Sequence, residues 1–161
     1  MNNNGIAQNV NKAYNLIKNE KPLYFIAINT KSVLRVKDLR FKTGFYLRTT
    51  MKDFDYGFKP IKYLFVIEYS EALSNRSKDE ITRLGEFVHL LISSNIDLER
   101  LKALFYVCWQ GVSNTKFERI DDRNDLNEFH GYLIKQQKSF TEDSFRTNLL
   151  KKTIKMPHLV L

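Results

Sequence analysis

Two apolar runs in the middle of the chain constrain the fold more than any other feature. Residues 61–69 are apolar on both faces of an extended backbone, which predicts a central strand covered by helices on one side and by a partner on the other. Residues 87–92 form the next such run, and the two pair most simply as antiparallel neighbours. The polar stretch between them, residues 71–85, is expected to be a short helix or a mobile loop.

The flanking segments complete an alternating order of strands and helices. A strand at 23–29 and a helix at 36–53 precede the two runs, and a helix at 97–109, an edge strand at 115–120 and a helix at 125–137 follow them. This β-α-β-β-α-β-α order predicts an α+β fold. Its expected form is a ferredoxin-like or RNA-recognition-motif-like antiparallel sheet with helices packed on one face.

The two ends of the chain are expected to add little to this plan. The 161 residues suit a single domain, whose core runs from about residue 22 to residue 137. The polar start, residues 1–11, predicts a loose end without a secretion signal, and a short helix is expected at 12–20. Residues 139–161 form a basic tail, in which a helix is expected at 142–152.

The net charge indicates the class of binding partner, and the cysteine content indicates the cellular compartment. The net charge of +8 favours a polyanionic partner, most often nucleic acid. The alternative is a lysine-rich surface that only reflects the codon composition of an AT-rich genome. The single cysteine, Cys108, excludes an intramolecular disulfide framework and fits a reducing, cytoplasmic compartment. The apolar runs are far too short to cross a bilayer, so no membrane partner is expected.

A carboxylate and an imidazole lie on the two predicted central strands. Glu68 ends the first apolar run, and His89 lies inside the second. Together with water, these two ligand types suit Mn²⁺ or Mg²⁺, and such an ion polarises a phosphodiester. The alternative is structural: His89 packs in the core with its hydrogen bonds satisfied, and Glu68 reaches water at the strand end.

A tyrosine and a lysine lie one turn apart on the predicted 125–137 helix. Tyr132 falls beside the apolar stripe of that helix, next to Lys135. A tyrosine hydroxyl can attack phosphorus to give a covalent phosphotyrosine, and a nearby ammonium group favours the phenolate and holds the phosphate. The alternative is that Tyr132 packs on the flank of an amphipathic helix.

The order of these residues resembles the replication-initiator branch of the HUH endonuclease superfamily, in particular the inovirus and prophage replication-protein type. In that family a strand ends in a glutamate, as residues 63–69 do here, and the next strand carries histidine-hydrophobic-histidine followed by aliphatic residues. Here that frame, residues 87–92, begins with Phe87 in the slot of the first histidine and has His89 in the second. A later helix carries tyrosine and lysine, as Tyr132 and Lys135 do, and the likeness spans roughly residues 22–137.

The resemblance implies a rolling-circle type of reaction on single-stranded or hairpin DNA. Tyr132 would cut and rejoin the strand, Lys135 would assist, and Glu68 and His89 would hold Mn²⁺ or Mg²⁺ on the scissile phosphate. Because Phe87 replaces one ligand, the alternative is a degenerate relative that keeps the fold and a basic surface but has lost the chemistry. A third class, a protein-interaction module, predicts an exposed apolar patch at residues 54–58 or 156–161.

Basic residues around the predicted strands and helices are the candidate DNA contacts, since lysines and arginines neutralise phosphates while aromatic rings stack on unpaired bases. The candidates are Arg35, Lys37, Arg40, Lys42, Lys62 and Lys138. The alternative for each is a solvated surface cation. The oligomeric state and the choice between DNA and RNA stay open.

Overall fold

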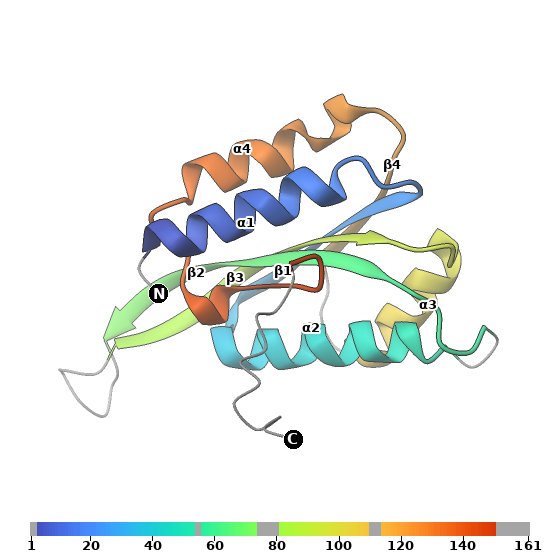
Figure 1. Cartoon of the computed structure of the whole chain (residues 1–161). Coiled ribbons are helices and arrows are strands. Elements are labelled where there is room, and N and C mark those ends of the chain that lie inside the picture. The colour runs from blue at the N-terminus through green and yellow to red at the C-terminus, as the bar shows by residue number, and fades with distance from the viewer. Residues whose placement is uncertain (1–2, 54–55, 74–80, 110–113, 151–161) are drawn as a thin grey trace, which may run out of the picture.

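An antiparallel sheet forms the centre of the structure, a computed structural model that describes residues 3–53, 56–73, 81–109 and 114–150 (Figure 1). Within these ranges the sheet has five strands in the order β4-β1-β3-β2-β5, and every pair of neighbours is antiparallel. The strands are β1 (Leu23–Arg35), β2 (Lys62–Leu73), β3 (Ile81–Ser93), β4 (Asn114–Ile120) and β5 (Phe145–Thr147).

Two crossover helices cover one face of this sheet. Helix α2 (Val36–Met51) connects β1 to β2, and α3 (Leu98–Cys108) connects β3 to β4. Asp97 caps α3, as its sequence predicts, because its side chain accepts a hydrogen bond from the backbone N–H of Arg100. The predicted α+β class and its antiparallel sheet, built in the order β-α-β-β-α-β, are therefore confirmed.

The opposite face of the sheet is also covered by helices, which corrects the expectation of helices on one face only. Figure 1 shows α1 (Asn3–Ile17) and α4 (Asn127–Lys135) on the far side of the sheet from α2. The reason lies in the strands, because alternate residues of β2 point to opposite faces and both sets are buried. Leu64 and Val66 pack in the core with α1 and α4, whereas Phe65 packs in the core with α2 and α3.

Helix α1 replaces the loose N-terminal end that the polar composition suggested. Its inward residues follow helical spacing and are buried against β2 and α4; they are Ile6, Val10, Ala13, Tyr14 and Ile17. The asparagines between them lower the mean hydropathy of the segment, but the apolar residues still form one face of a helix. The short helix expected at 12–20 is thus the end of a longer one.

The central strands continue well beyond the apolar runs. The β2–β3 ladder pairs residues from Lys62↔Ser93 to Leu73↔Ile81, so residues 71–73 and 81–85 are extended and neither helical nor looped. Residues 74–80 lie outside the described part of the chain. This long hairpin projects past the helices in Figure 1.

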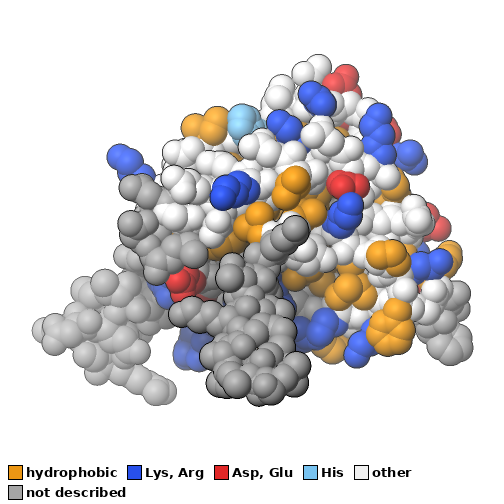
Figure 2. Space-filling model, in the orientation of Figure 1, with side chains coloured by type: hydrophobic (Ala, Val, Ile, Leu, Met, Phe, Trp, Pro, Cys, Tyr) orange, Lys and Arg blue, Asp and Glu red, His pale blue; other side chains and the backbone are white. Residues whose placement is uncertain are grey.

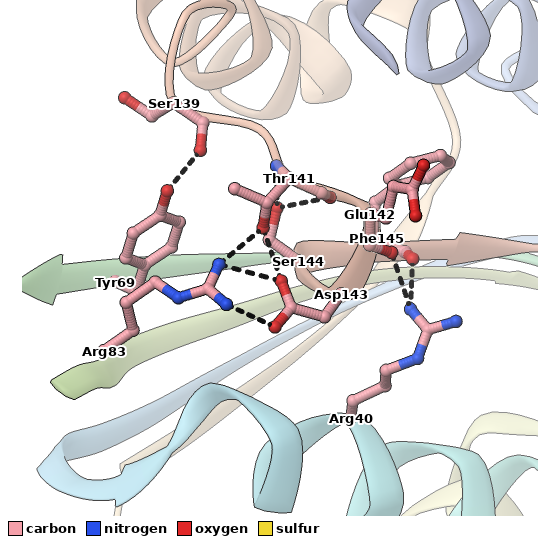
Figure 3. A network of polar contacts seen from close by, with 9 residues as sticks. All are labelled: Arg40, Tyr69, Arg83, Ser139, Thr141, Glu142, Asp143, Ser144 and Phe145. Carbon is pink, nitrogen blue, oxygen red and sulfur yellow. Dashed lines mark hydrogen bonds and ion pairs between the residues drawn. The ribbon is translucent and has the colours of Figure 1, made fainter. Parts of the chain in front are cut away.

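The segment after α4 folds back over the sheet instead of forming the helix expected at 142–152. A short 3-10 helix (Glu142–Ser144) leads into β5, which pairs with the outer edge of β2. Figure 3 shows how side chains hold this segment: Arg83 makes two bonds of 3.0 and 2.8 Å to Asp143, and Tyr69 donates to the Ser139 carbonyl at 2.6 Å. Residues 151–161 of the predicted tail lie outside the described ranges.

In the described ranges, none of the helices combines the length and the apolar character that crossing a bilayer requires.

Candidate active site

Glu68 lies on β2, on the face of the sheet that α1 and α4 cover. It pairs with Phe87 across the ladder, two residues beyond the fully buried Val66 on the same side of the strand. Its side chain keeps 27% of its surface exposed. The carboxylate therefore lies where the apolar layer under α4 opens to water.

His89 lies on β3, the strand with β1 on one side and β2 on the other. It pairs with Ala27 and Val66, and its side chain is only 14% exposed. Its Nε2 atom is 3.5 Å from the Oε2 atom of Glu68. Neighbouring strands have thus brought together the carboxylate and the imidazole that the sequence singled out.

Tyr132 reaches the same place from α4. The buried side chains of Phe129 and Leu133 press α4 against the sheet. As a result the Tyr132 ring lies over the imidazole of His89, with 4.2 Å between ring centroids and an angle of 39°. The predicted acid, imidazole and phenol, far apart in the sequence, converge on one face of the sheet.

Aromatic rings surround the imidazole on its other sides. Phe87 stacks against His89 with centroids 5.9 Å apart, and Phe25 stacks against it at 6.2 Å. Phe129 meets it edge-on at 6.5 Å. Phe87, where the resembled motif has its first histidine, therefore packs against the imidazole.

The spacing of Glu68 and His89 suits either a direct hydrogen bond between them or a divalent cation completed by water and phosphate. Two ligands at about 2.1 Å from one ion lie about 3.0–3.5 Å apart at octahedral or tetrahedral angles, which matches the 3.5 Å between Nε2 and Oε2. In the described ranges, no group of three or more His, Cys, Asp or Glu side chains is arranged to hold a metal ion. Mg²⁺ needs no such cage, because it usually binds through one or two carboxylates and substrate phosphates.

The electrostatics around Tyr132 favour the neutral phenol. Burial raises the pKa of its hydroxyl most, and the neighbouring Glu68, Tyr69 and Glu86 raise that pKa further. A phenolate at this position therefore needs added positive charge, such as a bound cation would supply.

Glu86 is a residue of this site that the sequence reasoning missed. The ladder pairs Phe87 with Glu68 and Gly85 with Tyr69, which leaves Glu86 as the extra residue of a β-bulge. Gly85 faces α2, because a Cβ atom there would lie 1.9 Å from Leu39 Cδ1, whereas Phe87 faces His89. A glycine inside a strand is a recognised signal for a bulge, but residues 71–85 read as a polar loop.

The other predicted catalytic residue, Lys135, is exposed at the last position of α4. His130, on the same helix, is also exposed and stacks on Tyr14 with centroids 5.1 Å apart. Neither residue contributes to the convergence of Glu68, His89 and Tyr132.

The predicted DNA-binding cations are not gathered around Tyr132. Lys62 starts β2, six residues before Glu68 along the strand, and pairs with Glu20 at 2.7 Å. Arg40 donates to the backbone carbonyls of Glu142 at 3.2 Å and Phe145 at 2.6 Å, which gives it a structural role (Figure 3).

The remaining candidates are spread over the surface. Lys42 lies over the Trp109 ring, with its Nζ atom 5.7 Å from the centroid. Arg35 ends β1, Lys37 is in the first turn of α2, and Lys138 follows α4; all three are exposed. Lys37 and Lys42 belong to α2, on the opposite face of the sheet from Tyr132.

One apolar patch predicted for a protein-interaction module falls partly within the described ranges. Tyr56 and Phe58 are 44% and 80% exposed, and Lys59 lies over the Tyr56 ring at 5.5 Å. Residues 54–55 and 156–161 lie outside those ranges.

Comparisons with known proteins assign no family. No family model matches the chain, and no curated protein matches it. Among solved structures, the crystal structure of the hypothetical protein ORF119 from Sulfolobus islandicus rod-shaped virus 1 is similar at 16% identity and a TM-score of 0.48, covering 83% of this chain and 97% of that one. A likeness at this level carries no argument about activity.

Proposed function

We propose that this chain cuts single-stranded or hairpin DNA by transesterification, with Tyr132 as the nucleophile. The observation that carries the proposal is the convergence of Tyr132 with His89, at 4.2 Å between rings, and of His89 with Glu68, at 3.5 Å between Nε2 and Oε2. Three side chains whose chemistry suits phosphoryl transfer thus come together from a helix and two strands.

In the proposed step, the Tyr132 oxygen forms a bond to phosphorus and the bond from phosphorus to the 3′ oxygen breaks. The phenolic proton leaves to a water molecule, and the departing 3′ oxygen takes a proton from water. The products are a 5′-phosphotyrosine and a strand with a free 3′ hydroxyl. Glu68 and His89 would hold Mg²⁺ or Mn²⁺, whose positive charge would offset the burial and the carboxylates that disfavour the phenolate.

The test uses a library of end-labelled stem-loop oligonucleotides with Mn²⁺ or Mg²⁺. The expected result is a covalent protein–DNA adduct that is absent from the Tyr132→Phe variant and from samples treated with a chelator. Tyr106→Phe is the matched control, because Tyr106 lies on α3 and is 57% exposed. Two results would remove Tyr132 from this role. One is an adduct that persists in Tyr132→Phe, and the other is a wild-type protein that forms no adduct with any divalent metal.

Restoring the missing ligand sharpens the test. Phe87 stacks on His89 and shares its face of β3, so Phe87→His places a second imidazole beside the first. We expect this variant to bind Mn²⁺ more tightly, as measured by calorimetry, and to form adduct at lower metal concentrations. Unchanged metal affinity would indicate that position 87 does not face the metal.

A second candidate function is nucleic-acid binding without cleavage. Two observations favour it: Phe87 stands where the resembled motif has its first histidine, and burial and the neighbouring carboxylates raise the pKa of Tyr132. Salt-sensitive oligonucleotide binding without adduct under any metal would identify this outcome.

A further inference from the structure

The outer surface of α2 carries two exposed aromatic rings with cations on either side of them. Helical spacing places five exposed residues on one stripe, here called the α2 stripe: Lys37, Phe41, Phe45, Arg48 and Lys52. In Figure 2, hydrophobic and basic side chains lie side by side over the part of α2 that the grey atoms leave visible. The stripe lies on the opposite side of the sheet from Tyr132.

The two phenylalanines of the stripe are exposed although the sheet offers a core. Phe41 is 69% exposed and Phe45 47%, whereas the neighbouring Tyr46 is fully buried. The rings are four residues apart, so they lie one turn from each other on the same face. Adjacent exposed rings flanked by cations are the arrangement with which proteins stack unpaired bases.

Guanidinium groups converge beside the stripe over Gly44. The Nη1 atoms of Arg146 and Arg48 lie 3.2 and 3.3 Å from the place where a Gly44 Cβ atom would stand. A third guanidinium, that of Arg40, lies close enough for Arg146 to lower its pKa, after the larger effect of burial, and Asp143 acts in the opposite direction. Like charges held this close repel each other, and a bound anion such as a phosphate relieves that repulsion.

A cleft of about 370 Å³ adjoins the same stripe between α2 and α3. Its lining residues are Phe45, Arg48, Thr49, Lys52, Asp53, Arg100 and Leu104. Its one acid, Asp53, is fully buried and is held by two hydrogen bonds from Arg100. Within the described ranges neither Arg48 nor Lys52 forms an ion pair. The cleft therefore presents positive charge beside the ring of Phe45.

We propose that the α2 stripe and its cleft bind single-stranded nucleic acid. Phosphates lie at Arg48 and Arg146, bases stack on Phe41 and Phe45, and one base enters the cleft. A single strand is the occupant that fits, because stacking needs unpaired bases and the basic residues need a polyanion. The binding site is separate from Tyr132 and does not depend on its chemistry.

The test measures fluorescence anisotropy of labelled oligothymidylate and oligouridylate of about 12 nucleotides in about 50 to 200 mM salt. We expect Phe41→Leu/Phe45→Leu, which keeps apolar side chains but removes the rings, to weaken binding at least about tenfold. Arg48→Gln/Arg146→Gln should weaken binding too. It should also reduce the slope of log affinity against log salt concentration by roughly 1 to 1.5, as the loss of two phosphate contacts predicts. A preference for DNA or for RNA identifies the strand, and either supports the proposal.

Gly44→Ala is the sharpest single variant, because it displaces two guanidinium groups without removing a charge. The new Cβ atom would lie tightly against Nη1 of both Arg48 and Arg146, which can move aside as flexible side-chain ends. We expect weaker oligonucleotide binding at unchanged net charge. Unchanged binding in this variant would show that no phosphate lies between the two arginines.

Matched controls separate this surface from general effects of charge and exposed rings. Phe58→Ala removes an exposed ring elsewhere, and Lys12→Gln removes an exposed cation on α1. Both should retain wild-type affinity. The proposal is overturned if no oligonucleotide binds, if the stripe variants bind like the controls, or if polyglutamate displaces the oligonucleotide equally well, which would indicate an acidic peptide as the partner.

Discussion

The bulge that carries Glu86 depends on a contact between Gly85 and Leu39, and that contact can be tested by a double-mutant cycle. Gly85 lies in the middle of the sheet, where Thr30 Oγ1 donates to its carbonyl at 2.5 Å. A Cβ atom at residue 85 would lie 1.9 Å from Cδ1 of Leu39 and 3.5 Å from Cγ2 of Ile67. Since Leu39 is fully buried in the core under α2, its side chain has no free space to move into.

The magnitudes of the three variants follow from this geometry. Gly85→Ala overpacks the core and should cost about 1–3 kcal/mol of unfolding free energy. Leu39→Ala leaves a cavity and should cost about 2–5 kcal/mol. In the double variant the clash is absent and the new methyl group fills part of the cavity. Its cost should therefore stay near that of Leu39→Ala alone, with a favourable coupling of about 1–3 kcal/mol.

The assay is urea unfolding followed by circular dichroism, with the requirement that the m-value is the same in all variants. Gly131→Ala is the matched control, because a Cβ atom there meets nothing within 4 Å, and the change should stabilise α4 by about 1 kcal/mol. Additive costs, with a coupling below about 0.5 kcal/mol, would refute the contact and the account of the bulge.

Two further predictions concern charge. Burial raises the pKa of three tyrosines, Tyr14, Tyr46 and Tyr132. Because unfolded tyrosines ionise near about pH 10 and the folded ones above it, their contribution to stability is complete below about pH 10 and is lost as the pH rises further. Phenolate absorbance should then appear together with unfolding; full ionisation of a chain with native circular dichroism would contradict this. Asp143→Asn breaks the two-bond contact with Arg83, in which each side chain is about one third exposed, and should cost about 1 kcal/mol in urea unfolding. The exposed Glu99→Gln is its control and should change stability little.

Sequence patterns were sufficient to predict the helices and strands that have a clear apolar periodicity or a clear capping residue. The central strands follow from their β-branched and aromatic residues, and α3 follows from Asp97 and its inward leucines. The first half of helix α1 was missed because its asparagines lower the mean hydropathy, although Ile6, Val10 and Ile17 keep helical spacing. Hydropathy averaged along a segment hides a pattern that only the spacing reveals.

The second helical layer and the end of the chain depend on contacts that sequence patterns do not record. Residues of β2 that are apolar on both faces require two covers, but nothing local to β2 tells whether a partner or a distant helix supplies the second. Likewise, the 139–147 segment is held by bonds from Arg40, Tyr69 and Arg83, which are 60 or more residues away along the chain. Such long-range polar contacts override the weak helical preference of residues 142–150.

The same reasoning explains why the candidate site could be predicted only in part. Glu68, His89 and Tyr132 break the apolar pattern of the elements that carry them, and residues that break a local rule are expected where function requires it. Glu86 breaks no visible pattern, because its place depends on the bulge. Glu68 and Glu86 both favour the neutral form of the Tyr132 phenol, because each raises its pKa. We therefore expect Glu68→Gln to lower the pKa of the Tyr132 hydroxyl, as measured by phenolate absorbance during a pH titration. The same variant should abolish adduct formation, because the proposed metal would lose its carboxylate ligand.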